Sequence, residues 1–295
     1  MPKLQAVIAT DTINLDKYSP AAGGAAGDWG TSPLGFSALR GLDGAVTLNV
    51  KNLIYSGVAF GPSAIAANLV AGRLDARIVS GSSSETSVVL DGSGPTDTFA
   101  LVFTGRNTNA ASLLGRLLGI TWLDGGASFN ATLSGTGKIQ QEMIATLTGE
   151  AQIILADGWL RGLDIRHALT AVTREVQKTW PGAGKGETPF TSLSASFTIA
   201  DGIAAMKNFR LESPALTMSG TGEIDLLRRA LDLRVDPQLV AAASGEPAGL
   251  PVAIVVKGPW GSPRVYPDMA DIVANPKAAY DKLKGMGLTG AQGGD

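Results

Sequence analysis

Alternation of apolar and polar residues, with a period of two, constrains the fold of this chain more than any other feature of its sequence. Over residues 192–199, every second residue is apolar and the residues between are Ser or Thr. The same alternation occurs over residues 46–51 and 231–236. Successive side chains of a strand point to opposite faces of a sheet, so each segment predicts a strand with one apolar and one polar face. Such strands are typical of antiparallel sheets that are solvated on one side.

Asp-Gly dipeptides punctuate the alternating segments and predict hairpin turns. Asp-Gly is a strong signal for a two-residue hairpin, because the turn needs positive φ at both central residues. The loose recurrence of the dipeptide predicts successive β-meanders in an elongated architecture. The five pairs are Asp43-Gly44, Asp91-Gly92, Asp124-Gly125, Asp157-Gly158 and Asp201-Gly202.

Helical periodicity is rare in this chain, and three segments carry it. Residues 164–179 place their apolar side chains on one stripe, which predicts a helix with one buried face. Residues 109–118 and 269–284 predict two further helices. We therefore expect a mainly β chain with about three short helices.

The composition removes most catalytic and metal-binding chemistries from consideration. The chain has no Cys and a single His, which excludes disulfides, Cys-ligated zinc, iron–sulfur clusters, thiol nucleophiles and sites with several His ligands. His167 falls on the polar side of the helix predicted over 164–179, so we interpret it as solvated. The net charge of −2 provides no basic surface for nucleic acid. We expect no enzymatic activity, no cofactor, no metal and no nucleic-acid partner.

Two short motifs look like ligand sites but have simpler interpretations. Residues 182–188 look like a phosphate-binding loop, yet Gly186 follows Lys185 where that loop needs Ser or Thr, so we interpret the segment as a connector. The pair Arg228-Arg229 could contact anionic head groups, and we interpret it as a charged turn between two strands.

The apolar strand faces are the feature that points to a function. Phe99, Leu101 and Phe103 share one face of a single predicted strand, which in most proteins is simply core. The three predicted helices are short and far apart, so they cannot cover the apolar faces of so many strands. The sheet must therefore fold on itself or be covered by a ligand.

A series of short segments then resembles a known protein family. The chain is similar to the C-terminal region of AsmA-family proteins, which are relatives of TamB-like and bridge-like lipid transfer proteins. The resemblance is densest over residues 145–268, and residues 11–18 also look like a family landmark. The matching segments, in family order, are residues 147–153, 156–165, 188–190, 193–197, 202–203, 211–214, 220–226 and 256–260, with Pro263, Pro267 and Asp268.

The resemblance implies a fold and a role. Proteins of this family belong to the envelope of diderm bacteria, where an N-terminal helix usually anchors them in the inner membrane and the rest extends through the periplasm. Their implied fold is a long antiparallel sheet curled into an open trough, with an apolar interior for phospholipid tails. The implied role is lipid transport toward the outer membrane, in outer-membrane biogenesis and homeostasis. We therefore expect phospholipid and the inner or outer membrane as partners, and an envelope protein that the sequence does not identify is a further candidate.

The chain departs from the family pattern in two places. It shows no N-terminal anchor, and residues 78–82 read Ile-Val-Ser-Gly-Ser where the family often has an aromatic-Gly-Gly strand. We expect the chain to be either the C-terminal piece of a longer, inner-membrane-anchored periplasmic protein or the product of a reading frame that begins at Met1. Alternation at Leu4, Ala6 and Ile8 predicts an edge strand that continues into further strands of the full protein.

We expect three parts along the chain. Residues 1–145 form β-meander repeats of the trough, with the short helix near 109–118. Residues 146–268 form the AsmA-like C-terminal β region, with the helix near 164–179. Residues 269–295 form a C-terminal helix and a flexible Gly-rich tail.

Two functions from different classes remain open. In the first, the chain is an envelope module that holds phospholipid acyl chains in an apolar β-groove, since each buried CH₂ contributes ~0.8 kcal/mol without any polar contact. In the second, the apolar faces close on themselves and exposed sheet edges dock a partner protein, without lipid. The candidate groove residues are Val46, Leu48, Phe99, Leu101, Phe103, Phe129, Leu193, Phe197, Ile199, Leu231, Leu233, Val252, Ile254 and Val256.

Overall fold

The alternating segments fold as neighbouring strands of one 14-stranded sheet, in which the strands follow one another in chain order. The computed structural model describes residues 3–17, 29–55, 58–81, 84–162, 186–214, 216–239 and 253–268. The strands are β1 (Lys3–Asn14), β2 (Asp43–Tyr55), β3 (Val58–Val70), β4 (Arg73–Ser80), β5 (Ser84–Asp91), β6 (Thr98–Asn109), β7 (Leu123–Thr136), β8 (Thr148–Arg161), β9 (Glu187–Ala200), β10 (Ile203–Glu212), β11 (Leu216–Asp225), β12 (Ala230–Leu239), β13 (Ile254–Pro259) and β14 (Arg264–Pro267).

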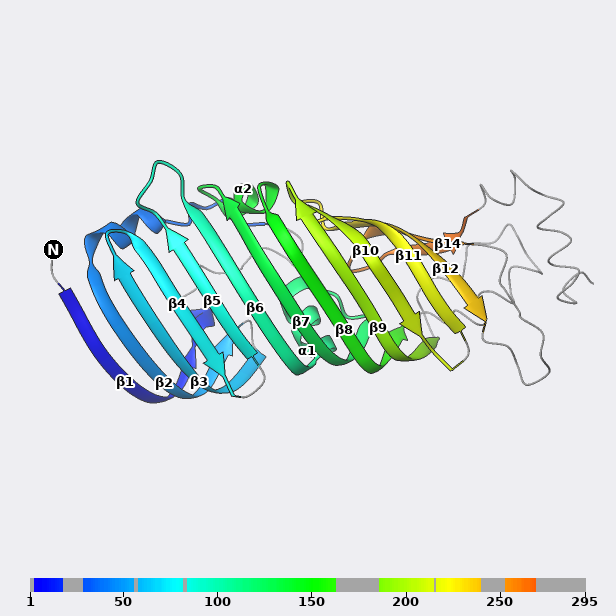
Figure 1. Ribbon diagram of the computed structural model, residues 1–295, viewed down its shortest axis with the longest axis horizontal. Helices are drawn as coiled ribbons and strands as arrows, with labels where there is room; N and C mark the ends of the chain where they lie inside the picture. The colour runs from blue at the N-terminus through cyan, green and yellow to red at the C-terminus, as the bar shows by residue number, and fades with distance from the viewer. Residues whose placement is uncertain are drawn as a thin grey trace, which may run out of the picture.

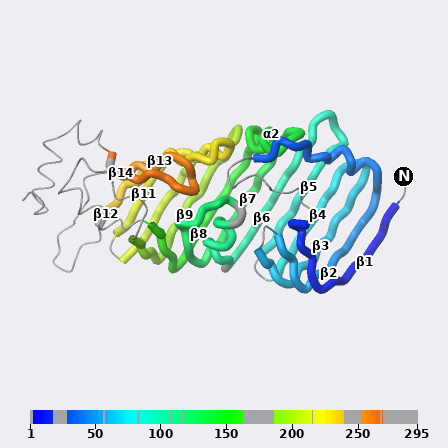
Figure 2. Tube along the Cα trace, turned by 180° about the vertical axis from the view of Figure 1, so that it is seen from behind, coloured from blue at the N-terminus to red at the C-terminus, as the bar shows by residue number. Residues whose placement is uncertain are grey.

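The sheet is long, curved and open. Figure 1 shows the strands side by side along the longest axis, from β1 at one end to β12 and β14 at the other. The strand order ends at β1 and β14, which do not pair with each other. Seen from behind, β13 and β14 lie in front of β11 and β12, so the sheet curls at this end (Figure 2). The predicted fold class, a mainly β chain with an elongated, curved sheet, is confirmed.

One strand pair corrects the expectation of an antiparallel sheet throughout. β1 and β2 run parallel, with Lys3 opposite Asp43. Parallel neighbouring strands need a long crossover connection, and residues 15–42 connect β1 to β2. Both strands therefore begin at the same edge of the sheet. The described part of this connection contains two 3₁₀ helices, η1 (Leu15–Lys17) and η2 (Phe36–Gly41).

The second half of this connection, residues 29–41, runs along one edge of the sheet, and we call it the edge segment. At its start the indole of Trp29 donates a hydrogen bond of 2.9 Å to the carbonyl oxygen of Leu226, in the turn between β11 and β12. Near its end Arg40 donates a hydrogen bond of 2.6 Å to the carbonyl oxygen of Gly92, just after β5. The edge segment therefore ties together turns that lie far apart along the sheet.

The helix predicted over residues 109–118 is confirmed as α1 (Ala110–Leu118). The side chain of Asn109 caps it by accepting a hydrogen bond of 2.8 Å from the backbone N–H of Ser112. Gly119, with φ of 74°, ends the helix in the left-handed conformation that favours glycine.

A second helix, α2 (Gln140–Ala145), was not predicted, because six residues are too few to show helical periodicity. The helices predicted over 164–179 and 269–284, and the Gly-rich tail, lie outside the described residues. The division expected between residues 145 and 146 stays a prediction, and β7 and β8 pair on either side of it.

Of the five Asp-Gly pairs, one forms the predicted hairpin turn. Asp201 and Gly202, with φ of 48° and 74°, join β9 to β10. The prediction was wrong for the other four, because three of them lie within strands and the fourth lies at the end of a strand without forming a two-residue hairpin turn. Asp124-Gly125 and Asp157-Gly158 face each other at an irregularity in the pairing of β7 with β8, Asp43-Gly44 begins β2, and Asp91-Gly92 follows from the end of β5.

The core lies on one face of the sheet, toward its C-terminal end. Buried apolar side chains from α1 and from strands β7 to β13 form one cluster, which includes the fully buried Leu155, Leu211, Leu216 and Ile254. The buried apolar side chains of β2 are Val50 and Leu53, and β3 to β6 contribute none among the described residues. The apolar face over these N-terminal strands is therefore only partly covered by the chain itself.

Candidate functional site

The pairing register places one apolar row across the sheet, from β2 to β14. Residues directly opposite on neighbouring strands point to the same face. Direct partners can be followed strand by strand from Leu48 to Val265, and all of them except Thr86 are apolar residues or Gly. The row consists of Leu48, Ile65, Ile78, Thr86, Phe103, Ala131, Ala151, Phe197, Met206, Gly222, Leu233, Val256 and Val265.

This face forms the floor of a groove with a volume of about 1400 Å³. Each strand from β2 to β14 contributes to the lining, so the groove follows the long axis of the sheet. Its volume exceeds the ~300–1,000 Å³ typical of sites for drug-sized ligands. The structure brings these predicted groove residues together in the lining: Leu101, Phe103, Phe129, Leu193, Phe197, Ile199, Leu231, Leu233, Ile254 and Val256.

The remaining predicted groove residues lie outside this lining. Val46 and Leu48 share the apolar face, since Val46 lies two residues before Leu48 in β2. Phe99 packs against a small buried cluster that includes Leu147. Val252 lies outside the described residues. Contact of any of these side chains with lipid stays a prediction.

Helix α1 covers part of the groove. In Figure 1 it lies behind β6 and β7, on the concave side of the sheet. Its side chains Leu113, Leu114 and Leu118 line the groove, and so does Leu15 of η1. The apolar stripe of the helix thus faces the apolar face of the sheet, as expected for an amphipathic helix.

Three tryptophans from separate segments meet at the C-terminal part of the groove. The indole N–H of Trp122 donates a hydrogen bond of 2.8 Å to the carbonyl oxygen of Trp260, in the β13–β14 turn. The rings of Trp29 and Trp260 pack edge to face, with centroids 6.4 Å apart. All three residues line the groove. The sequence predicted none of the three as site residues, because each stands in a connecting segment without periodic neighbours.

Serines interrupt the apolar face near β3 to β5. Ser63 and Ser80 are direct cross-strand partners, and their hydroxyls lie 2.8 Å apart. Ser63 also hydrogen-bonds to the carbonyl oxygen of Gly61, at 3.0 Å. The buried hydroxyls are therefore satisfied by the protein itself, which favours a structural role.

An ion pair lies at the edge of the groove. Arg161, which lines the groove, donates from Nη2 to Oδ2 of Asp124 at 2.6 Å. This hydrogen bond is the main reason that the pKa of Asp124 lies below its ordinary value, and the backbone N–H of Gly125 lowers the pKa further, while partial burial opposes both. The pair joins the beginning of β7 to the end of β8.

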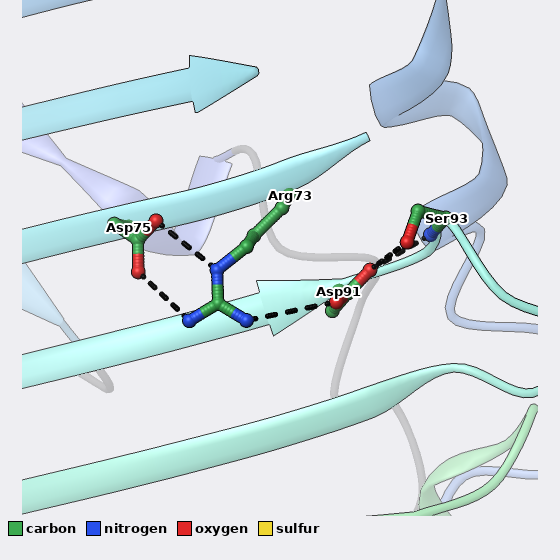
Figure 3. Close-up of polar contacts among 4 residues, drawn as sticks. All are labelled: Arg73, Asp75, Asp91 and Ser93. Atoms are coloured by element: carbon green, nitrogen blue, oxygen red, sulfur yellow. Dashed lines mark hydrogen bonds and ion pairs between the residues drawn. The ribbon is translucent and has the colours of Figure 1, made fainter. Parts of the chain in front are cut away.

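The opposite face of the sheet carries exposed ion pairs. Figure 3 shows Arg73 between Asp75 and Asp91, with Ser93 bonded to the same Asp91. The hydrogen bonds from Ser93 hold the pKa of Asp91 below its ordinary value, with a smaller contribution from the charge of Arg73. Exposed ion pairs of this kind contribute little to stability. These ion pairs place charged side chains on the face opposite the groove.

The groove is suited to bulk apolar contact. The described residues contain no cluster of three or more His, Cys, Asp or Glu side chains that could hold a metal ion. The floor offers aliphatic and aromatic surface along its length, with charge confined to its edges. Such a site can bind long hydrocarbon chains without recognising their ends.

Part of the chain matches a known protein family. Residues 73–209 match the family model described as AsmA family. Over this segment the chain is similar to the AsmA family. The AsmA match begins with the first residue of β4 and ends within β10, so it contains α1 and the middle strands of the groove floor. It begins and ends earlier than the region where the sequence resemblance is densest, residues 145–268.

No curated protein and no solved structure matches the chain. Among the described helices, none has the length and apolar character needed to cross a membrane. The AsmA match and the groove are therefore the two findings from which a function can be argued.

Proposed function

We propose that this chain is a lipid-binding module of the bacterial envelope that holds phospholipid acyl chains in the apolar groove. The observation that carries the proposal is the apolar row from β2 to β14 on the floor of a groove of about 1400 Å³. Over β3 to β6 the chain buries none of the described apolar side chains of this face fully. A ligand that covers this surface gains ~0.8 kcal/mol for each CH₂ removed from water.

The match of residues 73–209 to the AsmA family supports an envelope role, in outer-membrane assembly and lipid transport. On this proposal the protein works in the periplasm, and its partners are phospholipid and the inner or outer membrane. The proposal assigns the chain no catalytic step, no cofactor and no nucleic-acid partner. A long groove without a deep end suits transport, because acyl chains can shift along it without losing specific contacts.

Substitution of two adjacent residues of β6 tests the proposal. Phe103 lies on the groove floor, 6.5 Å from the ring of Phe129, whereas Val102 lies on the opposite face. Phe103→Asp places a charge among acyl chains, and Val102→Asp is the matched control. We expect the wild type and Val102→Asp to carry co-purified phospholipid in native mass spectrometry and to take up a fluorescent phospholipid. We expect Phe103→Asp to lose at least tenfold in uptake while circular dichroism still reports the sheet. Lipid-free wild type that takes up no phospholipid contradicts the proposal.

A second candidate function rests on the free edge of β1. This strand pairs with β2 on one side, and no described strand pairs with its other side. Its side chains are exposed, with Val7 81% accessible, and an exposed strand edge can bind a partner protein by strand addition. On this alternative the groove is a closed core, so Phe103→Asp unfolds the protein instead of sparing the sheet.

A further inference from the structure

A guanidinium without an acidic partner lies beside the groove. Cζ of Arg229, in the turn between β11 and β12, lies 4.1 Å from the ring centroid of Trp29 and 5.7 Å from that of Trp260. Both indoles line the groove. In the described part of the chain no carboxylate pairs with Arg229, and its Nε is buried without a hydrogen-bond partner.

The neighbouring arginines show that this arrangement is particular to Arg229. The side chain of Arg228 is 83% exposed and lies 3.3 Å from a carboxylate oxygen of Asp225. Arg161, at the groove edge, is paired with Asp124. A buried donor without a partner is costly. Contact with an indole ring occupies the flat face of a guanidinium and not the N–H donors in its plane, so the cation–π contacts of Arg229 do not compete with hydrogen bonds to an anion.

We propose that Arg229 binds the phosphate group of a ligand whose apolar part lies in the groove. The inference rests on the function proposed above and adds to it a head-group site. The planar guanidinium offers several N–H donors in a fixed geometry that matches phosphate oxygens. Trp29 and Trp260 position the guanidinium by cation–π contact, so the charge lies at the boundary between the turn and the apolar lining. A phospholipid supplies both parts of this ligand in one molecule.

Binding of two lipids by the full chain tests the inference. The probes are phosphatidylglycerol and a diacylglycerol with the same acyl chains but no phosphate, each titrated against a bound fluorescent phospholipid. We expect Arg229→Gln to lower the affinity for phosphatidylglycerol about tenfold. Its affinity for diacylglycerol should stay within twofold of the wild-type value. Arg229→Lys keeps the charge without the planar donors, so its affinity for phosphatidylglycerol should lie between those of the wild type and Arg229→Gln. Arg228→Gln, in the same turn, is the matched control and should leave the affinities for both lipids unchanged.

Three outcomes overturn the inference. If Arg229→Gln binds both lipids more weakly than the wild type does, and by the same factor, the residue has a structural role. If wild type and Arg229→Gln bind phosphatidylglycerol with equal affinity, Arg229 does not contact the phosphate. In both cases lipid still binds the wild type and the proposed function stands. Failure of the wild type to bind either lipid overturns the proposed function as well. Displacement by inorganic phosphate at millimolar concentration in the wild type, but not in Arg229→Gln, supports the same phosphate site with free phosphate as its source.

Discussion

The indole N–H of Trp122 donates a hydrogen bond of 2.8 Å to the carbonyl oxygen of Trp260, 138 residues further along the chain. Trp122 lies just before β7, and Trp260 follows β13. The strand directions place these two segments at opposite edges of the sheet, so the bond spans the open side of the groove between them. The C-terminal part of the groove is therefore bridged, and this contact contributes both to stability and to the shape of the site.

Trp122→Phe is expected to lower the free energy of unfolding by about 1 kcal/mol, because it removes the N–H donor but keeps a ring in the groove lining. Urea denaturation followed by circular dichroism measures the change. Trp159→Phe is the matched control, since Trp159 is exposed on β8 and should shift the midpoint less. Equal shifts in the two variants would show that the hydrogen bond to Trp260 is not the source of the effect.

Leu155→Ala is expected to destabilise the protein by about 2–5 kcal/mol, because Leu155 is fully buried in the larger core cluster and its loss leaves a cavity. The adjacent Ile154 lies on the opposite face of β8 and is 43% exposed. Ile154→Ala should therefore cost about 1 kcal/mol at most. Thermal or urea unfolding compares the two variants, and similar losses would contradict the assignment of the two faces.

Asp124→Asn is expected to destabilise the protein at neutral pH and to have less effect in acid. The pKa of Asp124 is lower in the folded state than in the unfolded chain, whose ordinary value is about 4. The charged carboxylate therefore stabilises the fold above that value, and this contribution is lost as pH falls through the folded-state pKa. Unfolding of wild type and variant between pH 7 and pH 3 measures it. In an Arg161→Gln background the difference should shrink at every pH, and an undiminished difference would contradict the role of the ion pair.

Val7→Lys is expected to reduce self-association of the isolated chain. The free edge of β1 exposes unpaired backbone groups, and charged side chains on an edge strand oppose pairing with a second copy. Sedimentation velocity over a range of concentrations measures the association. Thr47→Lys changes the same face of the neighbouring strand β2 without altering the edge, so it should associate like the wild type. A wild type that stays monomeric at high concentration contradicts this prediction.

The strands and the shared face of their apolar residues were predictable from the sequence. The period of two is a local property, so Phe99, Leu101 and Phe103 could be placed on one face before any partner strand was known. The helix near 109–118 was predictable for the same reason, because its stripe and its Asn109 cap lie within a few residues of each other. Of the thirteen residues in the apolar row, five were predicted from the sequence as groove candidates: Leu48, Phe103, Phe197, Leu233 and Val256.

The covering of that floor was decided by the tertiary structure alone. Whether β2 runs parallel or antiparallel to β1 depends on the path of a connection of more than 25 residues. The sequence of this connection shows no periodic pattern of apolar residues from which the path could be predicted. Asp-Gly forms a turn at Asp201 but a strand irregularity at Asp157, because the pairing of the neighbouring strands differs. The contacts of Trp122 with Trp260 and of Trp29 with Arg229 join segments more than a hundred residues apart. Periodicity determines which face of a strand is apolar, but only the closure of such distant segments in space determines what lies opposite that face.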